Sequence, residues 1–337
     1  MGFNRGMPNE RDDRAIEAES LTKIYRDFWR RPRVRALDGL AFEVRRGEVF
    51  GLLGPNGSGK STTLKLLLGL LHPTAGRLTV LGAGPRDVRA KARIGYLPEE
   101  SYLYPYLSAD ETLDFFGRMF GLGGAERRRR ADELLDMIGL RHARRRAVGE
   151  FSKGMARRIG LAQALINDPD LVILDEPTAG LDPMGCRQIK DLILALGRRG
   201  KTVLLSSHLL ADVEDVCDRI LILYNGRAQA TGTIRELLEE RTRVRVTLPE
   251  LAPEALRTVL RHLREALGRE PDVDHPRRDL EAFFLETVEK ARRAAPGAPS
   301  GAAASPGLAP YLVGAPPGGD GRAAGSPASG AGGGAAP

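Results

Sequence analysis

The fold of this chain is decided at residues 54–62, Gly54-Pro55-Asn56-Gly57-Ser58-Gly59-Lys60-Ser61-Thr62. The first eight residues fit the phosphate-loop pattern G-x-x-x-x-G-K-[ST]. In this pattern the glycines turn backbone N–H groups toward a β-phosphate, Lys60 neutralises the β- and γ-phosphates, and Ser61 ligates Mg²⁺. Residues 48–53 read as a short apolar strand, and residues 60–71 read as a leucine-rich helix. Because the loop lies directly between a strand and a helix, the sequence predicts a nucleotide-binding P-loop.

Candidate chemistry also follows two further apolar strands, predicted at residues 171–174 and 202–206. Ligands bind at the carboxyl ends of the strands in open α/β sheets. There Asp175 can hold Mg²⁺, Glu176 can polarise an attacking water as general base, and His208 can hydrogen-bond a γ-phosphate. Tyr25, upstream of these strands, can stack on adenine. Taken singly, an acidic pair is more often a helix cap or turn, and a histidine or tyrosine is an ordinary surface residue. The P-loop favours the functional interpretation.

The organisation of the chain is that of an α/β protein. Strand and helix signals alternate over residues 17–240, which is typical of a largely parallel sheet. A helical stretch at about 105–165 contains a capping box from Ser108 to Glu111. We expect a flexible N-terminus at 1–16, a small charged extension at 241–293 with an apolar stripe over 280–288, and a disordered tail at 294–337. In the tail 38 of 44 residues are Gly, Ala, Pro or Ser, too few apolar groups to offset ordering entropy.

Composition narrows the functional classes. The 337 residues include no apolar run of the roughly 18 residues that a membrane-spanning helix needs, and the first residues do not read as a signal peptide. Two cysteines, Cys186 and Cys217, form neither a disulfide framework nor a zinc motif. The net charge of +7 is concentrated between Glu126 and Arg158, where eleven Lys/Arg face five Asp/Glu. We interpret this stretch as a solvated helix face, with contact to anionic lipid headgroups left open. No interleaved aromatics suggest nucleic-acid binding.

Taken together, these residues resemble the ABC ATPases. The chain has, in the order seen in that family, Tyr25, the P-loop, Phe-Ser-Lys-Gly-Met at 151–155, Leu-Val-Ile-Leu-Asp-Glu-Pro-Thr at 171–178, Gly-Leu-Asp at 180–182 and His208. The resemblance covers residues 17–240, about two-thirds of the chain. It implies a P-loop NTPase with a largely parallel core sheet, an antiparallel β subdomain and an inserted helical subdomain. It also implies a head-to-tail dimer, in which the P-loop of one subunit and the signature segment of the other hold each ATP.

The resemblance assigns roles by position. The implied catalytic residues are Glu176 and His208, and the implied Mg²⁺ ligands are Ser61, Glu99 and Asp175. The implied ATP-binding residues are Tyr25, Gly54, Pro55, Asn56, Gly57, Ser58, Gly59, Lys60, Ser61, Thr62, Phe151, Ser152, Lys153, Gly154, Met155 and Asp182. Two positions depart from the family pattern: residues 151–155 replace Leu-Ser-Gly-Gly-Gln, and Glu99 replaces a glutamine. Asp182 followed by Pro183 also reads as a helix N-cap.

The functional expectation is an ATP-binding and ATP-hydrolysing transporter subunit. The resemblance implies a partner ATPase subunit and a separate integral membrane permease. The signature variant resembles exporter-type cassettes. We therefore expect a cytoplasmic protein held peripherally at the inner or plasma membrane through the permease, with ATP and Mg²⁺ as cofactors and no nucleic acid. The alternatives are a soluble ABC ATPase acting on DNA or ribosomes, and a regulatory cassette of low turnover. Against the first, the 92 residues from Lys60 to Ser152 show no sustained heptads, and only one set of motifs is present.

Overall fold

The computed structural model describes residues 13–29, 31–238, 251–268 and 308–312, and within them two sheets carry the fold. The larger sheet has the strand order β5-β6-β7-β3-β8-β9. Its strands are β3 (Val49–Leu53), β5 (Ile94–Leu97), β6 (Leu171–Asp175), β7 (Thr202–Ser207), β8 (Arg219–Tyr224) and β9 (Arg227–Thr233). All neighbouring pairs are parallel except β8 with β9. The strand interiors at β3, β6 and β7 are fully buried, which explains their continuous apolar runs.

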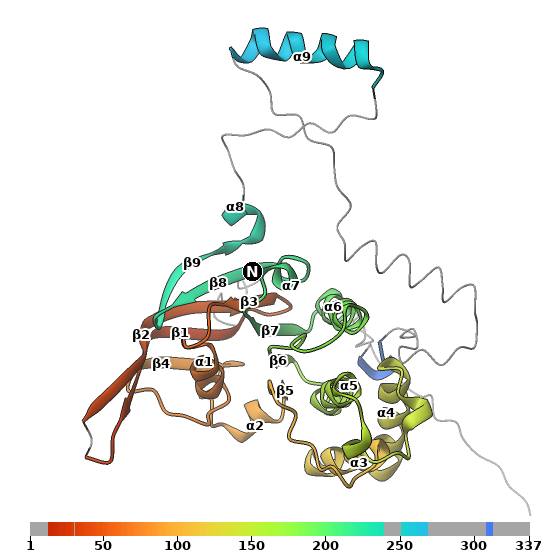
Figure 1. Cartoon of the computed structure of the whole chain (residues 1–337). Helices are drawn as coiled ribbons and strands as arrows, with labels where there is room; N and C mark the ends of the chain where they lie inside the picture. The colour runs from red at the N-terminus through yellow and green to blue at the C-terminus, as the bar shows by residue number, and fades with distance from the viewer. Residues whose placement is uncertain (1–12, 30, 239–250, 269–307, 313–337) are drawn as a thin grey trace, which may run out of the picture.

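The smaller sheet is antiparallel, with the order β2-β1-β4. Its strands are β1 (Arg14–Arg26), β2 (Pro32–Arg45) and β4 (Ala75–Val80). Helix α1 (Lys60–Leu67) contacts β2, β4 and β6, so it lies between the two sheets (Figure 1). Together the sheets and helices match the predicted fold class: a largely parallel core, an antiparallel β region and inserted helices.

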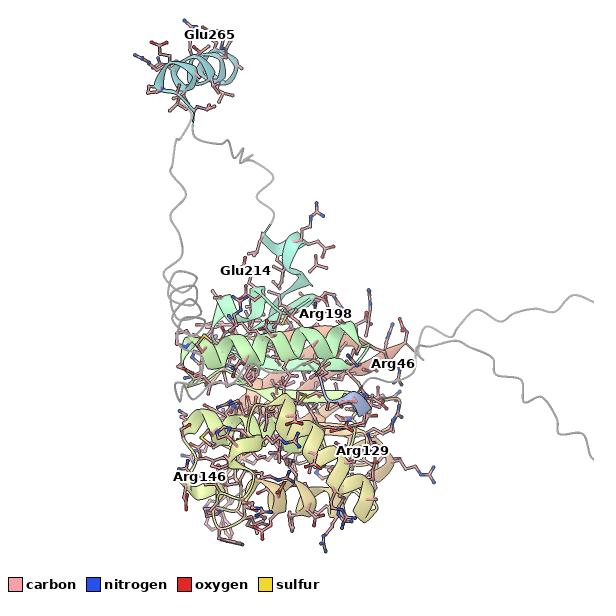
Figure 2. All side chains as sticks on the ribbon, turned by 90° about the vertical axis from the view of Figure 1, so that its right-hand side faces the viewer. Arg46, Arg129, Arg146, Arg198, Glu214 and Glu265 are labelled. Carbon is pink, nitrogen blue, oxygen red and sulfur yellow. The ribbon has the colours of Figure 1, made fainter. Side chains whose placement is uncertain are left out.

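The remaining helices cover the larger sheet. Helices α6 (Pro183–Arg198) and α7 (Leu210–Glu214) contact β7, and α6 also contacts β3. Helices α3 (Ala109–Met119), α4 (Gly124–Met137) and α5 (Lys153–Leu165) form a helical region, in which α5 contacts β5. Figure 2 shows this region, marked by Arg129 and Arg146, below the layer of α6, marked by Arg198. The shorter elements are α2 (Val88–Lys91), α8 (Ile234–Leu238) and the 3₁₀ turns Arg141–Ala143 and Val148–Glu150; a separate helix is α9 (Pro253–Leu267).

Local sequence signals predicted several boundaries correctly. Ser108 and Glu111 form the capping box that opens α3, and Asp182 caps α6 with Pro183 in its first turn. Asn225 and Gly226, with φ of 48° and 73°, make the turn of the β8–β9 hairpin. The helix predicted over 60–71 is shorter, because it ends at Leu67 and Gly69 has φ +65°. A Cβ on Gly69 would lie 2.5 Å from the Pro85 carbonyl oxygen, so the close approach requires glycine.

The charge cluster at residues 126–158 is mostly paired within the helical region. Arg127 contacts Asp114 at 2.5 Å, Arg130 contacts Glu126 at 2.6 Å, and Arg144 contacts Asp110 at 2.7 Å. The expected solvated face is wrong for Arg157 and Arg158, which are only 5% and 8% exposed. Both side chains turn inward from α5 to bond backbone carbonyl oxygens. The sequence pattern did not separate these two from their exposed neighbours.

Two expectations about the ends of the chain need correction. Residues 14–16, expected to be flexible, begin β1, and Ala15 and Ile16 are each 1% exposed. Part of the expected disordered tail is ordered: Leu308–Leu312 packs against the core of the helical region, with Ala309 and Leu312 each 1% exposed. The apolar stripe over 280–288, and the rest of the tail, lie outside the described residues.

Tyr311 holds this tail segment in place. Its hydroxyl donates to the Leu165 carbonyl at 2.9 Å, at the C-terminal end of α5, and its backbone N–H donates to Glu133 of α4 at 3.1 Å. The Arg130 guanidinium lies 4.5 Å from the ring centroid. A few apolar residues inside a Gly/Ala/Pro segment therefore suffice to dock it, because α4 and α5 supply hydrogen-bond and cation–π partners.

We expect Tyr311→Phe to raise the opening of residues 308–312 about 2- to 12-fold, because one hydrogen bond contributes about 0.5–1.5 kcal/mol net. Tyr311→Ala, which also removes the ring from Arg130, should raise it further. Hydrogen exchange of the full chain, followed on peptides from 308–312 and α4, measures both. Tyr224→Phe, on an exposed tyrosine at the end of β8, is the control. Unchanged exchange in both Tyr311 variants would show that the docking does not depend on this side chain.

Candidate functional site

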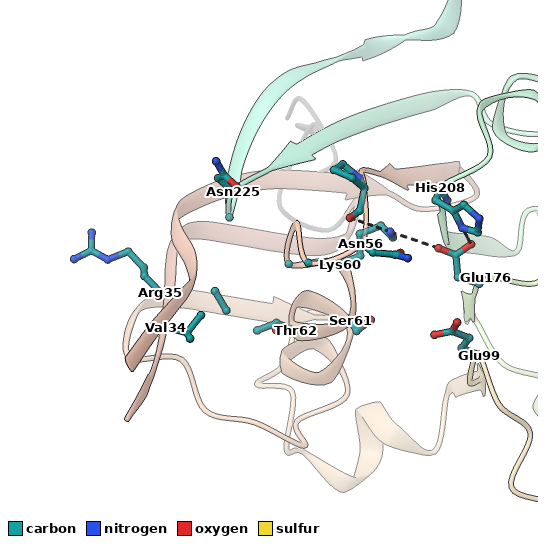
Figure 3. A pocket seen from close by; sticks show the side chains of 15 residues that line it. Val34, Arg35, Asn56, Lys60, Ser61, Thr62, Glu99, Glu176, His208 and Asn225 are labelled. Carbon is teal, nitrogen blue, oxygen red and sulfur yellow. Dashed lines mark hydrogen bonds and ion pairs between the residues drawn. The ribbon is translucent and has the colours of Figure 1, made fainter. Parts of the chain in front are cut away.

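A cleft of about 470 Å³ opens at the carboxyl ends of β3, β6 and β7. Its lining comes from the P-loop, the end of β5, the loops after β6 and β7, and the β2 and β8–β9 hairpins, as Figure 3 shows. The lining residues are Val34, Arg35, Ala36, Pro55, Asn56, Gly57, Gly59, Lys60, Ser61, Thr62, Glu99, Glu176, His208, Asn225 and Gly226. Parallel strands bring these segments together, although they are up to 192 positions apart along the chain, counting from Val34 to Gly226.

The P-loop has a geometry that only glycine permits at two positions. A Cβ on Gly54 would lie 2.2 Å from the Leu223 carbonyl oxygen. Gly59, at φ +114°, would place a Cβ 2.8 Å from the Ala36 carbonyl oxygen. The loop is therefore pressed against β2 and β8 while α1 starts at Lys60, so the positive end of that helix faces the cleft.

Lys60 is the buried cation of the cleft, 6% exposed. Its Nζ donates to the Gly54 carbonyl at 2.7 Å and lies 3.5 Å from Oε1 of Glu176. The ammonium group thus lies between the loop and the carboxylate of Glu176, the first residue after β6 (Figure 3). An arriving phosphate can replace these weaker partners with charge-assisted hydrogen bonds.

Glu176 is held rigidly at the other side of the cleft. Its Oε2 lies 2.8 Å from Nδ1 of His208, and its backbone N–H donates to the Ser206 hydroxyl at 3.1 Å. Its φ is +48°, a left-handed conformation that costs about 1–2 kcal/mol in a non-glycine residue. The carboxylate is thereby aimed into the cleft, next to the histidine that follows β7.

Asp175 lies immediately before Glu176 and is 6% exposed. The Ser206 hydroxyl donates to its Oδ1 at 2.5 Å. Burial raises the pKa of Asp175 above its usual value, and the Glu176 charge adds to this, while Ser206, Arg157 and Lys60 oppose it. A cation bound beside Asp175 would relieve the same burial penalty.

The oxygen groups of the cleft fit Mg²⁺ bound together with phosphate. Ser61 and Glu99 line the cleft, and Asp175 lies directly before Glu176. Within the described ranges no group of three or more acidic, histidine or cysteine side chains could hold a metal alone. Mg²⁺ commonly uses one or two protein carboxylates and completes its shell with substrate phosphates and water. This donor set therefore suits a nucleotide-dependent magnesium site.

Tyr25 lies at the end of β1, beside the cleft rather than in its lining. Its hydroxyl is 3.4 Å from the Thr62 hydroxyl, and its side chain is 37% exposed. The Lys23 ammonium lies 5.6 Å from its ring centroid. The ring is thus accessible next to the first turn of α1, where a base attached to a phosphate in the P-loop can reach it.

The predicted signature residues occupy a different place. Ser152 caps α5 by accepting from the Met155 N–H at 3.2 Å, and Lys153 and Gly154 follow it in the first turn of the helix. Phe151 and Met155 pack against the core. Asp182 caps α6, accepting from the Gly185 N–H at 3.1 Å. None of these residues lines the cleft, so the single chain does not bring them to the P-loop.

Arg157 is the residue that sequence reasoning missed. From α5 it donates to the carbonyl oxygens of Asp175 at 2.5 Å, Glu176 at 2.7 Å and Glu99 at 2.8 Å, and it also bonds Pro98 and Pro177. One guanidinium therefore joins the loop after β5 to the loop after β6. The sequence offered only an arginine in the second turn of a helix that begins near Ser152, within a stretch rich in other arginines.

Several lining residues were not assigned to the site from the sequence. Val34, Arg35 and Ala36 come from β2, and Asn225 and Gly226 come from the β8–β9 turn. The Gly226 carbonyl accepts from the Asp38 N–H at 2.9 Å, and the Gly226 N–H donates to the Ser58 carbonyl at 2.9 Å. The β8–β9 turn thus bonds the P-loop directly. This arrangement depends on strands that are distant in sequence.

Comparison with known proteins is consistent with this geometry. Residues 37–179 match the family model described as ABC transporter. An uncharacterised ABC transporter ATP-binding protein of Synechocystis sp. is 45% identical over 77% of this chain and 73% of that protein. The Nod factor export ATP-binding protein I of Burkholderia pseudomallei is 44% identical over 60% of this chain and 67% of its own length. Among solved structures, the dimeric post-hydrolysis state of the cassette MJ0796 with ADP and Pi is 28% identical, with a TM-score of 0.60, and covers 65% of this chain and 99% of that one.

Proposed function

The chain belongs to the ABC transporter ATP-binding proteins, the ATPase subunits of these transporters, and from this premise we propose that it hydrolyses ATP with Mg²⁺ to drive export through a separate membrane permease. The observation that carries the proposal is the convergence of Lys60, Ser61, Glu99, Glu176 and His208 on one cleft, with Asp175 beside it. The name of the Burkholderia relative supports the export direction. The alternative action on DNA or ribosomes gains no support from the fold or the relatives.

The P-loop is proposed to hold the phosphates of ATP. Lys60 exchanges its contacts with the Gly54 carbonyl and Glu176 for the β- and γ-phosphates. The backbone of residues 54–62 and the start of α1 supply N–H groups and a favourable helix dipole. Tyr25 is proposed to stack on adenine, since its exposed ring adjoins Thr62.

The chemical step is proposed to use Glu176 as general base. Its carboxylate accepts the proton of a water aligned with the γ-phosphate, and the contact with His208 at 2.8 Å fixes its orientation. Ser61, Asp175 and Glu99 would hold Mg²⁺, which would neutralise phosphate charge. The family pattern has a glutamine at the position of Glu99. A carboxylate there can also ligate Mg²⁺, so chelation of the metal should stop ATP hydrolysis.

The signature segment is proposed to act on the ATP of a second subunit. Phe151, Ser152, Lys153, Gly154 and Met155 lie outside the cleft of their own chain, at the N-terminal end of α5. Ser152 is exposed, and a helix N-terminus favours an anion. A head-to-tail partner places this end of α5, with Asp182 nearby on α6, opposite the P-loop. The same head-to-tail arrangement is proposed for a second copy of this chain and for a paralogue.

An aromatic patch is proposed as the docking surface for the permease. It consists of Tyr102, Tyr104, Tyr106, Phe115, Met119 and Phe120, each at least 37% exposed. Tyr104 contacts Phe115 and Tyr106, with ring centroids 5.3 and 5.8 Å apart. The patch begins three residues after Glu99, which lines the cleft. One short loop therefore connects the nucleotide site to a surface rich in the side chains that interfaces favour. The chain would then be held at the cytoplasmic face of the membrane.

The test is affinity purification of Glu176→Gln from native membranes with ATP and Mg²⁺. This variant should stall on bound ATP and retain its partners, so a polytopic membrane protein should co-purify in stoichiometric amount. Adding Tyr102→Ser and Tyr106→Ser should reduce that recovery at least about tenfold, since aromatic interface anchors commonly contribute 2 kcal/mol or more. Leu70→Ser, on an exposed residue three positions after α1, is the matched control. Recovery of ribosomal proteins or nucleic acid in place of a membrane protein would overturn the transporter assignment.

A further inference from the structure

The tip of the β1–β2 hairpin exposes two large aromatic side chains. Phe28 is 91% exposed and Trp29 is 73% exposed, and their rings meet edge to face with centroids 5.5 Å apart. The hairpin is closed just behind them: Asp27 N–H donates to the Arg31 carbonyl at 3.0 Å, and Arg31 N–H donates to the Asp27 carboxylate at 2.8 Å. The rings therefore project from a hydrogen-bonded turn and are largely uncovered by the residues that the structure describes.

The same segment is strongly basic. Residues 26–35 contain five arginines and one aspartate. Of these, Arg26, Arg31, Arg33 and Arg35 are exposed, and Arg35 pairs with Asp38 at 2.8 Å. In the helical region Arg127, Arg130 and Arg144 pair with nearby carboxylates, and the number of acidic residues is closer to the number of basic ones. The hairpin tip thus combines uncovered aromatic rings with a local excess of positive charge.

The tip also points toward one end of the molecule. In Figure 1 the β1–β2 hairpin descends to the lower end, where α3 lies, while α8 lies at the upper end. Figure 2 is turned about the vertical axis and again places the helical region at the bottom. The proposed permease-docking patch includes Phe115 and Met119 of α3. A permease seated on α3 would therefore bring its membrane to the side toward which the hairpin points.

We propose that the hairpin tip, residues 26–29 and 31–35, binds a membrane surface rich in anionic lipid headgroups. Aromatic side chains favour the headgroup level of a bilayer, where Phe28 and Trp29 would insert. Arginines near an anionic surface each contribute about fivefold in affinity, and this attraction is lost at high salt. The inference that the membrane lies on the side of the hairpin tip rests on the proposed function, but lipid binding itself does not require a permease.

Such a contact would bear directly on the nucleotide site. Val34 and Arg35 line the cleft, and Val34 pairs with Tyr25 across the hairpin. The tip and the cleft thus belong to one continuous pair of strands. Lipid binding at the tip would restrict the base of the hairpin beside the position proposed for adenine.

The experiment uses Trp29, the single tryptophan of the chain, as the reporter. The full-length protein is mixed with protein-free vesicles of phosphatidylglycerol and phosphatidylcholine, or of phosphatidylcholine alone. With the anionic vesicles at low salt, Trp29 emission should shift to shorter wavelength, and added salt should reverse the shift. Arg31→Gln with Arg33→Gln should weaken vesicle binding about 25-fold, from two arginines at about fivefold each. Phe28→Ala should weaken it further.

The matched control removes two exposed arginines elsewhere. Arg198→Gln with Arg199→Gln, at the end of α6, lowers the net charge equally and should leave vesicle binding unchanged. An equal loss in both double variants would show nonspecific attraction and overturn the proposal. No emission shift with anionic vesicles would overturn it as well. A shift only with vesicles that contain the permease would assign the tip to a protein contact instead. If no membrane protein co-purified with Glu176→Gln but Trp29 emission shifted with anionic vesicles, the proposed permease partner would be wrong and the lipid-binding proposal would stand.

Discussion

Glu176→Gln is expected to lower ATP hydrolysis about 10²–10⁴-fold while ATP binding persists, because a general base contributes that share of the rate. The amide keeps the size of the side chain but cannot accept the proton of the attacking water. Lys60 and Ser61 remain in place to hold ATP and Mg²⁺. Steady-state phosphate release and equilibrium binding of a fluorescent ATP analogue measure the two properties separately.

Glu214→Gln is the matched control for this prediction. Glu214 is an exposed carboxylate of α7, outside the cleft lining, so its neutralisation should leave the rate unchanged. A Glu176→Gln rate within about threefold of the parent would contradict the general-base assignment. If the parent itself turned over no faster than Glu176→Gln, the regulatory-cassette alternative would become the better description.

Arg157→Ala is expected to lower the free energy of unfolding by about 3–5 kcal/mol, the range for removing one partner of a buried charged network. The guanidinium is 5% exposed and bonds the carbonyl oxygens of Glu99, Asp175 and Glu176. Its loss removes a charged donor from all three carbonyls, of which the Glu176 carbonyl keeps the Ala179 N–H at 3.1 Å as a second donor. Urea unfolding of the full chain measures the change.

Arg157→Lys and Arg146→Ala complete this test. Lysine keeps the positive charge but lacks the planar fork that reaches two loops at once, so it should recover only part of the stability. Arg146 is exposed and pairs with Glu150 at 3.0 Å, so Arg146→Ala should cost about 0.5 kcal/mol or less. Equal effects of Arg157→Ala and Arg146→Ala would mean that the buried network does not stabilise the fold.

The fold class and the elements around the cleft could be predicted because their signals are local. The P-loop glycines are required by close backbone contacts, as the Cβ positions on Gly54 and Gly59 show. Buried parallel strands read as continuous apolar runs, and Ser108 and Asp182 mark helix starts by capping. Each of these signals acts within a few residues, so one sequence suffices to detect it. The roles of the site residues remain predictions until the variants are measured.

Other features depend on which segments the fold brings together. Arg157 looks like its solvated neighbours in sequence, yet tertiary packing turns it toward carbonyls contributed from positions 98–99 and 175–177. Leu308–Leu312 lies in a segment too poor in apolar residues to fold alone, and it is ordered because α4 and α5 supply its partners.

The sequence by itself thus determined the P-loop, the acidic strand end, the helix caps and the family, since these depend on residue type and short spacing. Only the tertiary structure decided which arginines are buried, which part of the tail docks, and which aromatic side chains remain uncovered at Phe28 and Trp29. The physical reason is that burial and partner choice are set by contacts between segments distant along the chain. A pattern within a single segment carries no record of them.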